Sequence, residues 1–265
     1  MKNTITLLFS FFLLGGIVQG QDTIALDSLR VLPQTAFQVG EELQFILHYG
    51  FINAGKATLR IEKGEKKYYG RPTYHIIGEG KTMGATDWFF KVRDKYETHI
   101  DQAGIFPWEF NRRVNEGGYK IKQDYYFEHH QGTVKDNKKK AYPLEAGMQD
   151  MLSAFYYART LDFESANFGD TFDIISFVDG ERFPMQIKLI GREKVSTKVG
   201  KFDCYRFTPM VQEGRVFKGE EDLSVWITAD GNHIPVLVEA EVLIGSVRME
   251  LSGYKNLRNP ISKVH

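Results

Sequence analysis

The sequence predicts an all-β protein: a strongly curved antiparallel sheet or half-open β-barrel, with one amphipathic helix inserted near residues 148–160. Aromatic residues make up 14% of the 265 residues and are spread through short segments in which apolar and polar side chains alternate. Gly, Asn and Asp separate these segments at turn positions, a pattern typical of antiparallel strands. Neither a repeat of fixed period nor a low-complexity linker divides the chain. Residues 37–257 are therefore expected to form a single β domain.

The chain begins with the pattern of a secretory signal peptide, MKNTITLLFSFFLLGGIVQG. It has an early lysine, an apolar run through Leu14 and small residues ahead of a charged segment. The apolar core is shorter than the roughly 20 residues that a membrane-spanning helix needs. We therefore expect residues 1–20 to be removed after Gly20, which leaves no transmembrane segment. Residues 21–36 would be a loose mature N-terminus, and residues 258–265 a frayed tail.

The charge balance gives no sign of a polyanionic partner. Lys plus Arg and Asp plus Glu each number 34, so bulk charge does not attract the protein to nucleic acid or to an anionic membrane. The single cysteine, Cys204, cannot form an intramolecular disulfide and lies among apolar residues in KFDCYRF. We expect it to be buried and inert. In an oxidising compartment the protein would then depend on its core for stability.

The first strands follow from the alternation of apolar residues. They are expected over residues 41–50, 56–63 and 74–82, with FINAG as the turn between the first two. A loop with the aromatic cluster DWFF, residues 87–90, comes next. If exposed, this cluster would stack on sugars or bind a partner, and if buried it would cap the mouth of the barrel. The sequence favours the buried alternative.

The next three strands can be placed in register with one another. A three-residue loop, Gln102–Gly104, fits a hairpin with positive φ at its last position, and this places Asp94 opposite Arg112. The two-residue Gly-Gly loop of EGGY places Arg112 opposite Gln123. Apolar residues then match across the strands, which supports the register because a one-residue slip would turn them outward. The matched sets are Val92, Val114 and Ile121, then Tyr96, Phe110 and Tyr125, then Thr98, Trp108 and Phe127.

Asp94, Arg112 and Gln123 would form a polar row on the apolar face of these strands. One interpretation is structural: an ion pair with an amide that satisfies the remaining hydrogen bonds. The other is functional: the row lines a cavity in the curved sheet and meets the polar head of a ligand. In that case the wall of the cavity would come from four aromatic residues, Trp108, Phe110, Tyr125 and Phe127.

A helix interrupts the strands in GMQDMLSAFYYARTLDF. The residues at helical spacing are Met148, Met151, Leu152, Phe155 and Tyr156. Asp150 lies near the N-terminal end, where a carboxylate suits the helix dipole. We expect roughly three turns that pack on, or plug, the concave side of the sheet. Strands then resume, with turns at Asp179–Gly180, near Gly200 and at Asp230–Gly231.

The chain lacks the motifs of the commonest hydrolases and metal sites. No G-x-S-x-G, H-E-x-x-H or C-x-x-C occurs. The adjacent His129 and His130 would point to opposite faces of a strand and so cannot easily bind one metal ion. No metal, cofactor or catalytic residue is predicted, and a binding protein is favoured over an enzyme. An envelope hydrolase using two carboxyl groups roughly 5 to 9 Å apart stays as the least favoured alternative.

Several stretches together resemble an exported bacterial family catalogued as domain of unknown function 3108. They are QVGEELQFILHYGFINAGKATL, DKYETHID with the following PWEF and EGGY, DMLSAFYYAR, TKVGKFDCYRFTPM and VWITADGNHIPVLVEAEV. The resemblance spans nearly the whole mature chain and is closest to forms typical of Bacteroidetes. It implies a curved antiparallel sheet or half-open barrel in a Gram-negative periplasm. The family carries no established catalytic residues, so none is transferred to this chain.

Two functions are expected from these features. The first is non-enzymatic binding of a lipid-like or other amphiphilic ligand in a groove of the curved sheet, with the polar row at the head group. The alternative is a cell-envelope assembly or polysaccharide-contacting module that acts through surface aromatic residues. Its contacts would be Trp88, Arg215 and Phe217. The partner would thus be a lipid-like or glycan ligand and not a nucleic acid, and the sequence identifies no protein partner.

Overall fold

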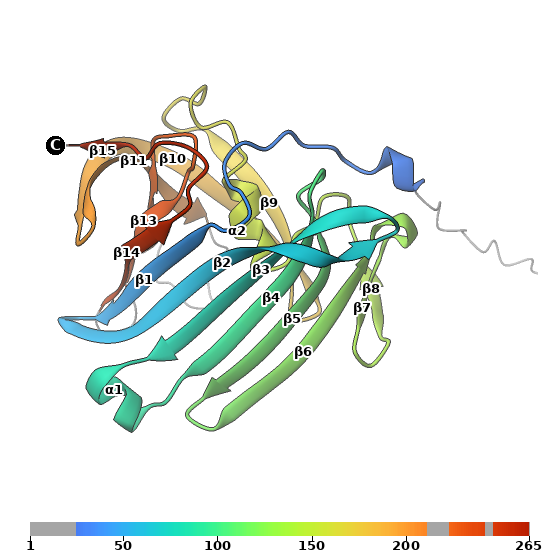
Figure 1. Ribbon diagram of the computed structural model, residues 1–265, viewed down its shortest axis with the longest axis horizontal. Coiled ribbons are helices and arrows are strands. Elements are labelled where there is room, and N and C mark those ends of the chain that lie inside the picture. The colour runs from blue at the N-terminus through green and yellow to red at the C-terminus, as the bar shows by residue number, and fades with distance from the viewer. Residues whose placement is uncertain (1–24, 211–222, 242–245, 265) are drawn as a thin grey trace, which may run out of the picture.

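The computed structural model describes residues 25–210, 223–241 and 246–264, and all fifteen strands within them belong to one sheet (Figure 1). The sheet has two parts, each a meander of antiparallel neighbours. The N-terminal wing contains β1 (Glu42–Tyr49), β2 (Ile52–Tyr68), β3 (Arg71–Thr82), β4 (Arg93–Asp101), β5 (Pro107–Glu116), β6 (Tyr119–Glu128), β7 (Thr133–Asp136) and β8 (Ala141–Pro143). The C-terminal wing contains β9 (Thr171–Val178), β10 (Glu181–Thr197), β11 (Gly200–Met210), β12 (Leu223–Thr228), β13 (Pro235–Glu241), β14 (Ser246–Lys255) and the short β15 (Lys263–Val264).

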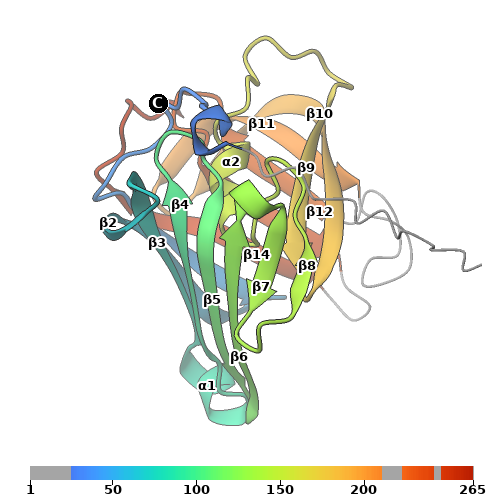
Figure 2. The same ribbon diagram turned by 90° about the vertical axis from the view of Figure 1, so that its right-hand side faces the viewer.

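The two wings meet at one seam, where β1 pairs with β14. Their outer edges, β8 and β9, do not pair with each other, so the sheet curves without closing into a barrel (Figures 1 and 2). The segment between them covers part of the β9 edge. The Gln149 N–H donates to the Ile175 carbonyl (2.8 Å), and the Phe177 N–H donates to the Gln149 carbonyl (2.7 Å). The predicted all-β, half-open fold is confirmed.

Two short α-helices occur in the described residues, α1 (Gly84–Phe89) and α2 (Ser153–Ala158), together with the 3-10 turns η1 (Leu26–Ser28) and η2 (His129–Gln131). Helix α2 lies on the inner side of the curved sheet (Figures 1 and 2). It has six residues, about half of the expected three turns. Of the predicted apolar stripe, Met148, Leu152 and Tyr156 belong to the core and Phe155 packs against it. Met151 is 42% exposed, so its place in the stripe was predicted wrongly.

Asp150 caps the start of α2 and ties it to the sheet. Its Oδ1 accepts hydrogen bonds from the N–H groups of Leu152 (2.7 Å) and Ser153 (2.8 Å), and its Oδ2 accepts one from the Thr98 hydroxyl of β4 (2.6 Å). The carboxyl group is fully buried, and this burial raises the pKa of Asp150 to about 6. The expected acidic residue at this end of the helix is thus also a tertiary anchor.

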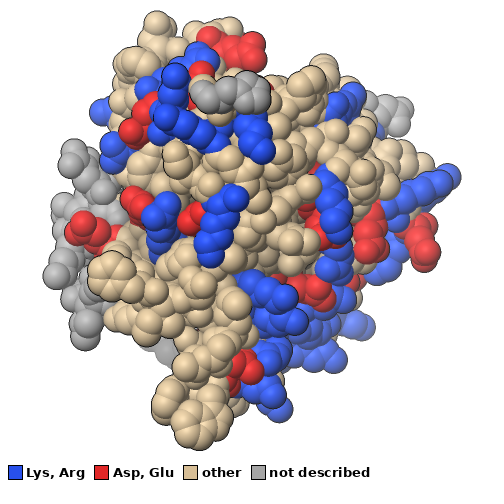
Figure 3. Space-filling model, turned by 60° about the vertical axis from the view of Figure 1, so that its left-hand side comes forward, with Lys and Arg blue, Asp and Glu red and all other residues tan. Residues whose placement is uncertain are grey.

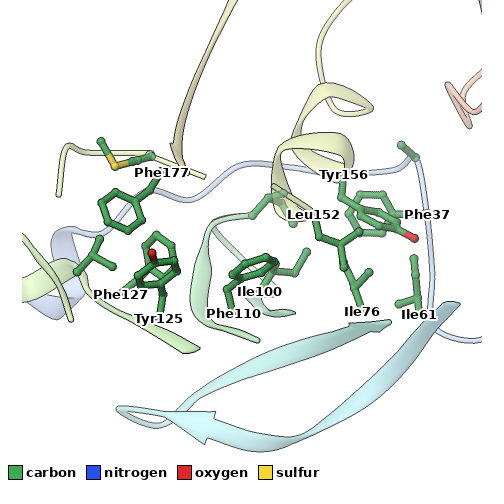
Figure 4. Packing of buried hydrophobic residues seen from close by; sticks show 14 residues of the cluster. Phe37, Ile61, Ile76, Ile100, Phe110, Tyr125, Phe127, Leu152, Tyr156 and Phe177 are labelled. Atoms are coloured by element: carbon green, nitrogen blue, oxygen red, sulfur yellow. The ribbon is translucent and has the colours of Figure 1, made fainter. Parts of the chain in front are cut away.

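The core of the N-terminal wing lies between its inner surface and residues that reach across from elsewhere in the chain (Figure 4). Phe177 lies over Tyr125 and Phe127, whereas Tyr156 packs edge-to-face on Phe37 with ring centroids 5.1 Å apart. A second cluster fills the C-terminal wing and includes Cys204. As predicted, Cys204 is free and buried.

A buried ion pair joins α2, the N-terminal segment and the C-terminal wing. The Arg159 guanidinium donates to both carboxylate oxygens of Glu41 (2.5 and 2.8 Å) and to the carbonyls of Ala36 (3.1 Å) and Asn232 (2.9 Å). Both side chains are 1% exposed. With its donors satisfied in this way, Arg159 holds three distant parts of the chain together.

The predicted register is correct between β5 and β6 and wrong between β4 and β5. Arg112 lies opposite Gln123 as expected, but its partner on β4 is Tyr96, so Asp94 and Arg112 are not opposite each other. From Lys95 to His99 the shift is two residues, which keeps these side chains on their predicted face. The loop is longer than three residues, a bulge lies between His99 and Ile100, and the positive φ occurs at Ile105.

The Asp101 carboxylate determines this turn. It accepts hydrogen bonds from the N–H groups of Ala103 and Gly104, from the Trp108 indole and from the Arg71 guanidinium. These bonds draw the chain round one carboxylate, which a rule based on loop length does not foresee.

The two ends of the described chain are held against the sheet. Arg30 donates hydrogen bonds to the carbonyls of Gly104 and Ile105, and Leu29 is buried. At the other end, Lys263–Val264 pairs with β11, and Asn259 hydrogen-bonds to residues of two other segments. The expected loose segment is therefore ordered from residue 25 onward. The expected frayed tail is wrong for residues 258–264.

Candidate functional site

An apolar groove lies on the inner surface of the N-terminal wing, beneath the start of α2. Its volume is about 270 Å³. The floor comes from Ala57 and Leu59 of β2, Gly78 and Gly80 of β3 and Tyr96 of β4, while Met151 and Leu152 form the roof. This volume is slightly below the ~300–1,000 Å³ of most small-molecule sites. The groove therefore has room for a narrow apolar group and not for a bulky ligand.

The two glycines keep the groove open. A side chain at Gly78 would meet Leu59 and Leu152, at 3.2 and 3.5 Å from its Cβ. A side chain at Gly80 would enter open space, where only the Asp94 Cβ lies within 4.0 Å. Because alternate strand residues share a face, these glycines lie side by side on the inner surface and leave a hollow there.

Polar residues adjoin one side of the groove. Along one row of the sheet, Leu59, Gly78, Tyr96, Arg112 and Gln123 are cross-strand neighbours in this order. The row changes from apolar to polar at Tyr96, over whose ring the Arg112 guanidinium lies at 5.8 Å. The groove therefore has an apolar floor next to a cationic side chain.

The carboxylate partner of Arg112 is Asp179 and not Asp94. Asp179 lies in the turn between β9 and β10, and its Oδ1 accepts a hydrogen bond from Arg112 Nη1 (3.0 Å) and lies 3.4 Å from Gln123 Nε2. The Arg112 side chain is 15% exposed, and its Nε is buried with no hydrogen-bond partner among the described residues. One donor of this guanidinium is thus left for another acceptor.

Asp94 lies in a different cluster. Its Oδ1 accepts a hydrogen bond from the Asn115 N–H (2.9 Å). Burial and the hydrogen bond with Asp94 raise the pKa of Glu116 above its usual range. Asp94 and Glu116 are thus neighbours, at the start of β4 and at the end of β5.

The four predicted wall residues are buried core and do not line open space. Phe110, Tyr125 and Phe127 belong to the main cluster, where Phe177 covers the last two. Trp108 belongs to a separate cluster with Leu29 and Phe106 and stacks on Tyr68 at 5.7 Å. The sequence correctly identified an apolar inner face, but the chain's own side chains fill the part of it that was assigned to a ligand.

Trp88 is strongly exposed, so the expectation that the DWFF cluster is buried is wrong. Trp88 and Phe89 are 84% and 78% exposed on α1, a helix with no buried residue. Arg215 and Phe217, the other two predicted partner contacts, lie outside the described residues. Trp88 therefore stays available as a surface contact.

Sequence analysis missed the glycine floor and Asp179. Gly78 and Gly80 stand in GEGKT, where alternation could have shown that two residues without side chains share the inner face. No local signal could have paired Asp179 with Arg112, which lies 67 residues earlier in the chain. Among the described residues, no group of three or more His, Cys, Asp or Glu is arranged to hold a metal ion.

Comparison with solved structures supports the fold. A β-barrel-like protein of Brucella abortus, from the DUF1849 domain of unknown function, aligns with a TM-score of 0.54 and 11% identity over 87% of this chain and 99% of that chain. A DUF1089 family protein of Pseudomonas aeruginosa gives a TM-score of 0.41 and 11% identity over 71% and 90%. A Bacteroides fragilis protein thought to be exported, with a YmcC-like fold, gives 0.32 and 11% over 86% and 100%. The first likeness shows the fold alone, and the two lower scores are too weak to add to it.

Comparisons at the level of sequence identify a family and no activity. None of the curated proteins matches the chain. The helices in the described part of the chain are too short or too polar to cross a membrane. The family described as protein of unknown function (DUF3108) matches residues 44–252. Because this match covers most of the chain and agrees with the motifs noted in the sequence, the protein belongs to the DUF3108 family.

Proposed function

We propose that the protein binds one apolar chain of an amphiphilic molecule in the groove beneath α2. The observation that carries this proposal is the row from Leu59 through Gly78 and Tyr96 to Arg112, which joins an apolar hollow to an unsatisfied cationic donor. An amphiphile has the same order of groups. The groove differs in position from the aromatic wall predicted by the sequence, but the class of ligand is the same.

The apolar part of the ligand would supply most of the affinity. Each methylene group removed from water contributes about 0.8 kcal/mol, so roughly six in the groove would contribute about 5 kcal/mol before the cost of association. Met151 in the roof is 42% exposed and has a flexible type of side chain, which suits apolar chains of different length. Binding of this kind selects for an unbranched or narrow apolar group and not for one exact compound.

The polar part of the ligand would be oriented by Arg112. Its Nε can donate to an ester, carboxylate or phosphate oxygen, since Asp179 occupies only Nη1. Gln123 is next to Arg112 in the sheet and adds an amide. The predicted signal peptide would place this binding in the periplasm. Residues 1–24 lie outside the described chain, and cleavage after Gly20 stays a prediction.

The experiment is native mass spectrometry of the mature protein purified from a periplasm, followed by solvent extraction of the bound material. The test variant is Gly80→Phe, because residue 80 lines the groove and an added Cβ there has only the Asp94 Cβ, at 4.0 Å, as a neighbour. The matched control is Gly191→Phe on β10, where an added Cβ finds no atom within 4 Å. Neither glycine has a positive φ.

We expect the wild-type protein and Gly191→Phe to carry an amphiphile. The bound fraction of Gly80→Phe should fall about tenfold or more, equivalent to ~1.4 kcal/mol. An empty wild-type protein that also takes up no added fatty acid or phospholipid would refute the proposal. So would equal ligand occupancy in the two variants.

The alternative function, an envelope assembly or polysaccharide-contacting module, has one supporting observation, the exposure of Trp88. The lysines near Trp88 favour a negatively charged surface as its partner over a polysaccharide.

A further inference from the structure

Exposed aromatic side chains gather at one end of the N-terminal wing. They come from three separate connections: the turn between β1 and β2, helix α1 with its C-terminal neighbour, and the turn between β5 and β6. These connections lie along the same edge of the sheet (Figure 1). We call this group the aromatic rim; its members are Phe51, Trp88, Phe89, Phe90 and Tyr119, all exposed.

Hydrogen bonds fix the rim in place. The Met83 N–H donates to the Ala54 carbonyl (3.0 Å), and the Gly117 N–H donates to the Lys91 carbonyl (2.9 Å), so the residues on either side of α1 are tied to β2 and to the turn between β5 and β6. Asp87 of α1 accepts hydrogen bonds from the Thr82 hydroxyl and from two nitrogens of Arg93. The helix is thus anchored by its polar side chains, while Trp88 and Phe89 are left in solvent.

Unpaired lysines lie beside the rim. The lysine patch consists of Lys56, Lys81, Lys91, Lys120 and Lys122, all exposed and none in an ion pair with a described residue. Lys56 faces Lys81 across the sheet, and Lys81 faces Arg93. Like charges directly opposite each other are unfavourable. Figure 3 shows Lys and Arg side chains crowded together beside an uncharged projection at the lower end of the molecule.

A hollow lies within this basic surface. Its volume is about 400 Å³, and its cationic lining residues are Lys56, Lys81, Arg93 and Lys95. Glu79 and Asp94 also line it. Glu79 is paired with Arg60, Arg93 with Asp87 and Lys95 with Glu97, so the cations of the lining without an ion pair are Lys56 and Lys81. The hollow is large enough for a phosphate group and several water molecules.

We infer that the aromatic rim and the lysine patch together dock on the surface of a bilayer that contains anionic phospholipid. Aromatic side chains on projecting turns suit the interface between head groups and acyl chains. Lysines near an anionic surface each strengthen binding about fivefold. A polysaccharide would require aromatic rings that form a platform with neighbouring hydrogen-bonding groups, whereas these rings project from an edge and adjoin cations.

Docking at this edge would bring the groove close to the membrane. Gly80 in the groove floor belongs to β3, the strand that leads into α1, and lies four residues before α1 begins. The docking inference stands without the proposed ligand, because no residue of the aromatic rim or of the lysine patch lines the apolar groove. If both hold, an amphiphile could pass between the bilayer and the groove over a short distance.

The experiment is co-sedimentation of the mature protein with phosphatidylcholine vesicles, with and without phosphatidylglycerol. The test variants are Trp88→Ser with Phe89→Ser, and Lys81→Glu with Lys120→Glu. The matched controls are Phe168→Ser and Lys188→Glu, two exposed residues of other parts of the chain. Since α1 buries no residue, the first test variant should keep the wild-type thermal unfolding temperature.

We expect wild-type binding to the anionic vesicles only, and loss of this binding near 1 M salt, where the screening length is about 3 Å. Each test variant should bind the anionic vesicles at least about tenfold more weakly than the wild type, and each control should bind as the wild type does. Gly80→Phe should also bind the anionic vesicles. This result would show that docking does not require the proposed ligand groove. Absence of vesicle binding, or equal binding by test and control variants, would overturn the inference. Retention on envelope polysaccharide without vesicle binding would also overturn it in favour of a glycan partner.

Discussion

The inner surface of the N-terminal wing is filled over β5 and β6 and hollow over β2 to β4. In the filled part, Phe177 packs on Tyr125 and Phe127 with ring centroids 4.9 and 6.1 Å away. In the hollow part, Gly78 and Gly80 lie under the start of α2, and the groove stays open. Both parts belong to the same meander and have alternating sequences. The difference shows that the covering segment and the strand residues together decide which part of the inner surface stays open: Phe177 fills one part, and two glycines leave the other hollow.

The largest expected effect comes from emptying the filled part. Phe177→Ala should lower the free energy of unfolding by about 3–5 kcal/mol, because it leaves a cavity among buried aromatic rings. Urea unfolding of the mature protein measures this loss. The control is Phe183→Ala on β10, where the side chain is 42% exposed. A loss below about 1 kcal/mol for Phe177→Ala would mean that the two parts are filled to a similar degree.

The stability of the protein should depend on pH through Asp150, which anchors the roof of the groove. Burial raises the pKa of Asp150 to about 6, whereas an unfolded aspartate titrates near 3.9. Between these values the folded protein binds the extra proton, so this group's contribution to stability falls as pH rises. The change is on the order of 3 kcal/mol between pH 4 and 7.

Asp150→Asn removes the titration while its amide can still bond to Thr98 and to the helix N–H groups. The stability of this variant relative to wild type should therefore increase from pH 4 to pH 7, as measured by urea unfolding at both values. A difference that does not change with pH would show that Asp150 is not held in its protonated form by burial.

The smallest expected effect concerns the contact between the filled part and the turn that follows Phe177. Asp179→Asn removes the charge opposite Arg112 and should cost less than about 1 kcal/mol, because the carboxylate is 63% exposed. Asn is chosen because residue 179 has a positive φ of 52°, which Asn tolerates. Asp203→Asn, which loses the exposed pair with Arg192, is the matched control. A much larger loss for Asp179→Asn would mean that this ion pair also fixes the filled part.

Turns were predictable where the backbone alone determines them. The Gly117–Gly118 turn gave the correct register for β5 and β6, because two glycines with positive φ fit a two-residue hairpin. The turn between β4 and β5 was predicted wrongly, because the Asp101 side chain gathers donors from Arg71 and Trp108. The error of two residues kept the faces correct, and it moved Asp94 away from Arg112.

The sequence by itself determined the all-β class, the register of β5 with β6 and the family, because alternation and turn residues act over a few positions. Only the tertiary structure decided that Phe177 covers part of that face, that Asp179 meets Arg112, and that α1 leaves Trp88 in solvent. These outcomes depend on contacts between residues far apart in the chain. A periodic pattern carries no information about which distant segment will supply the cover.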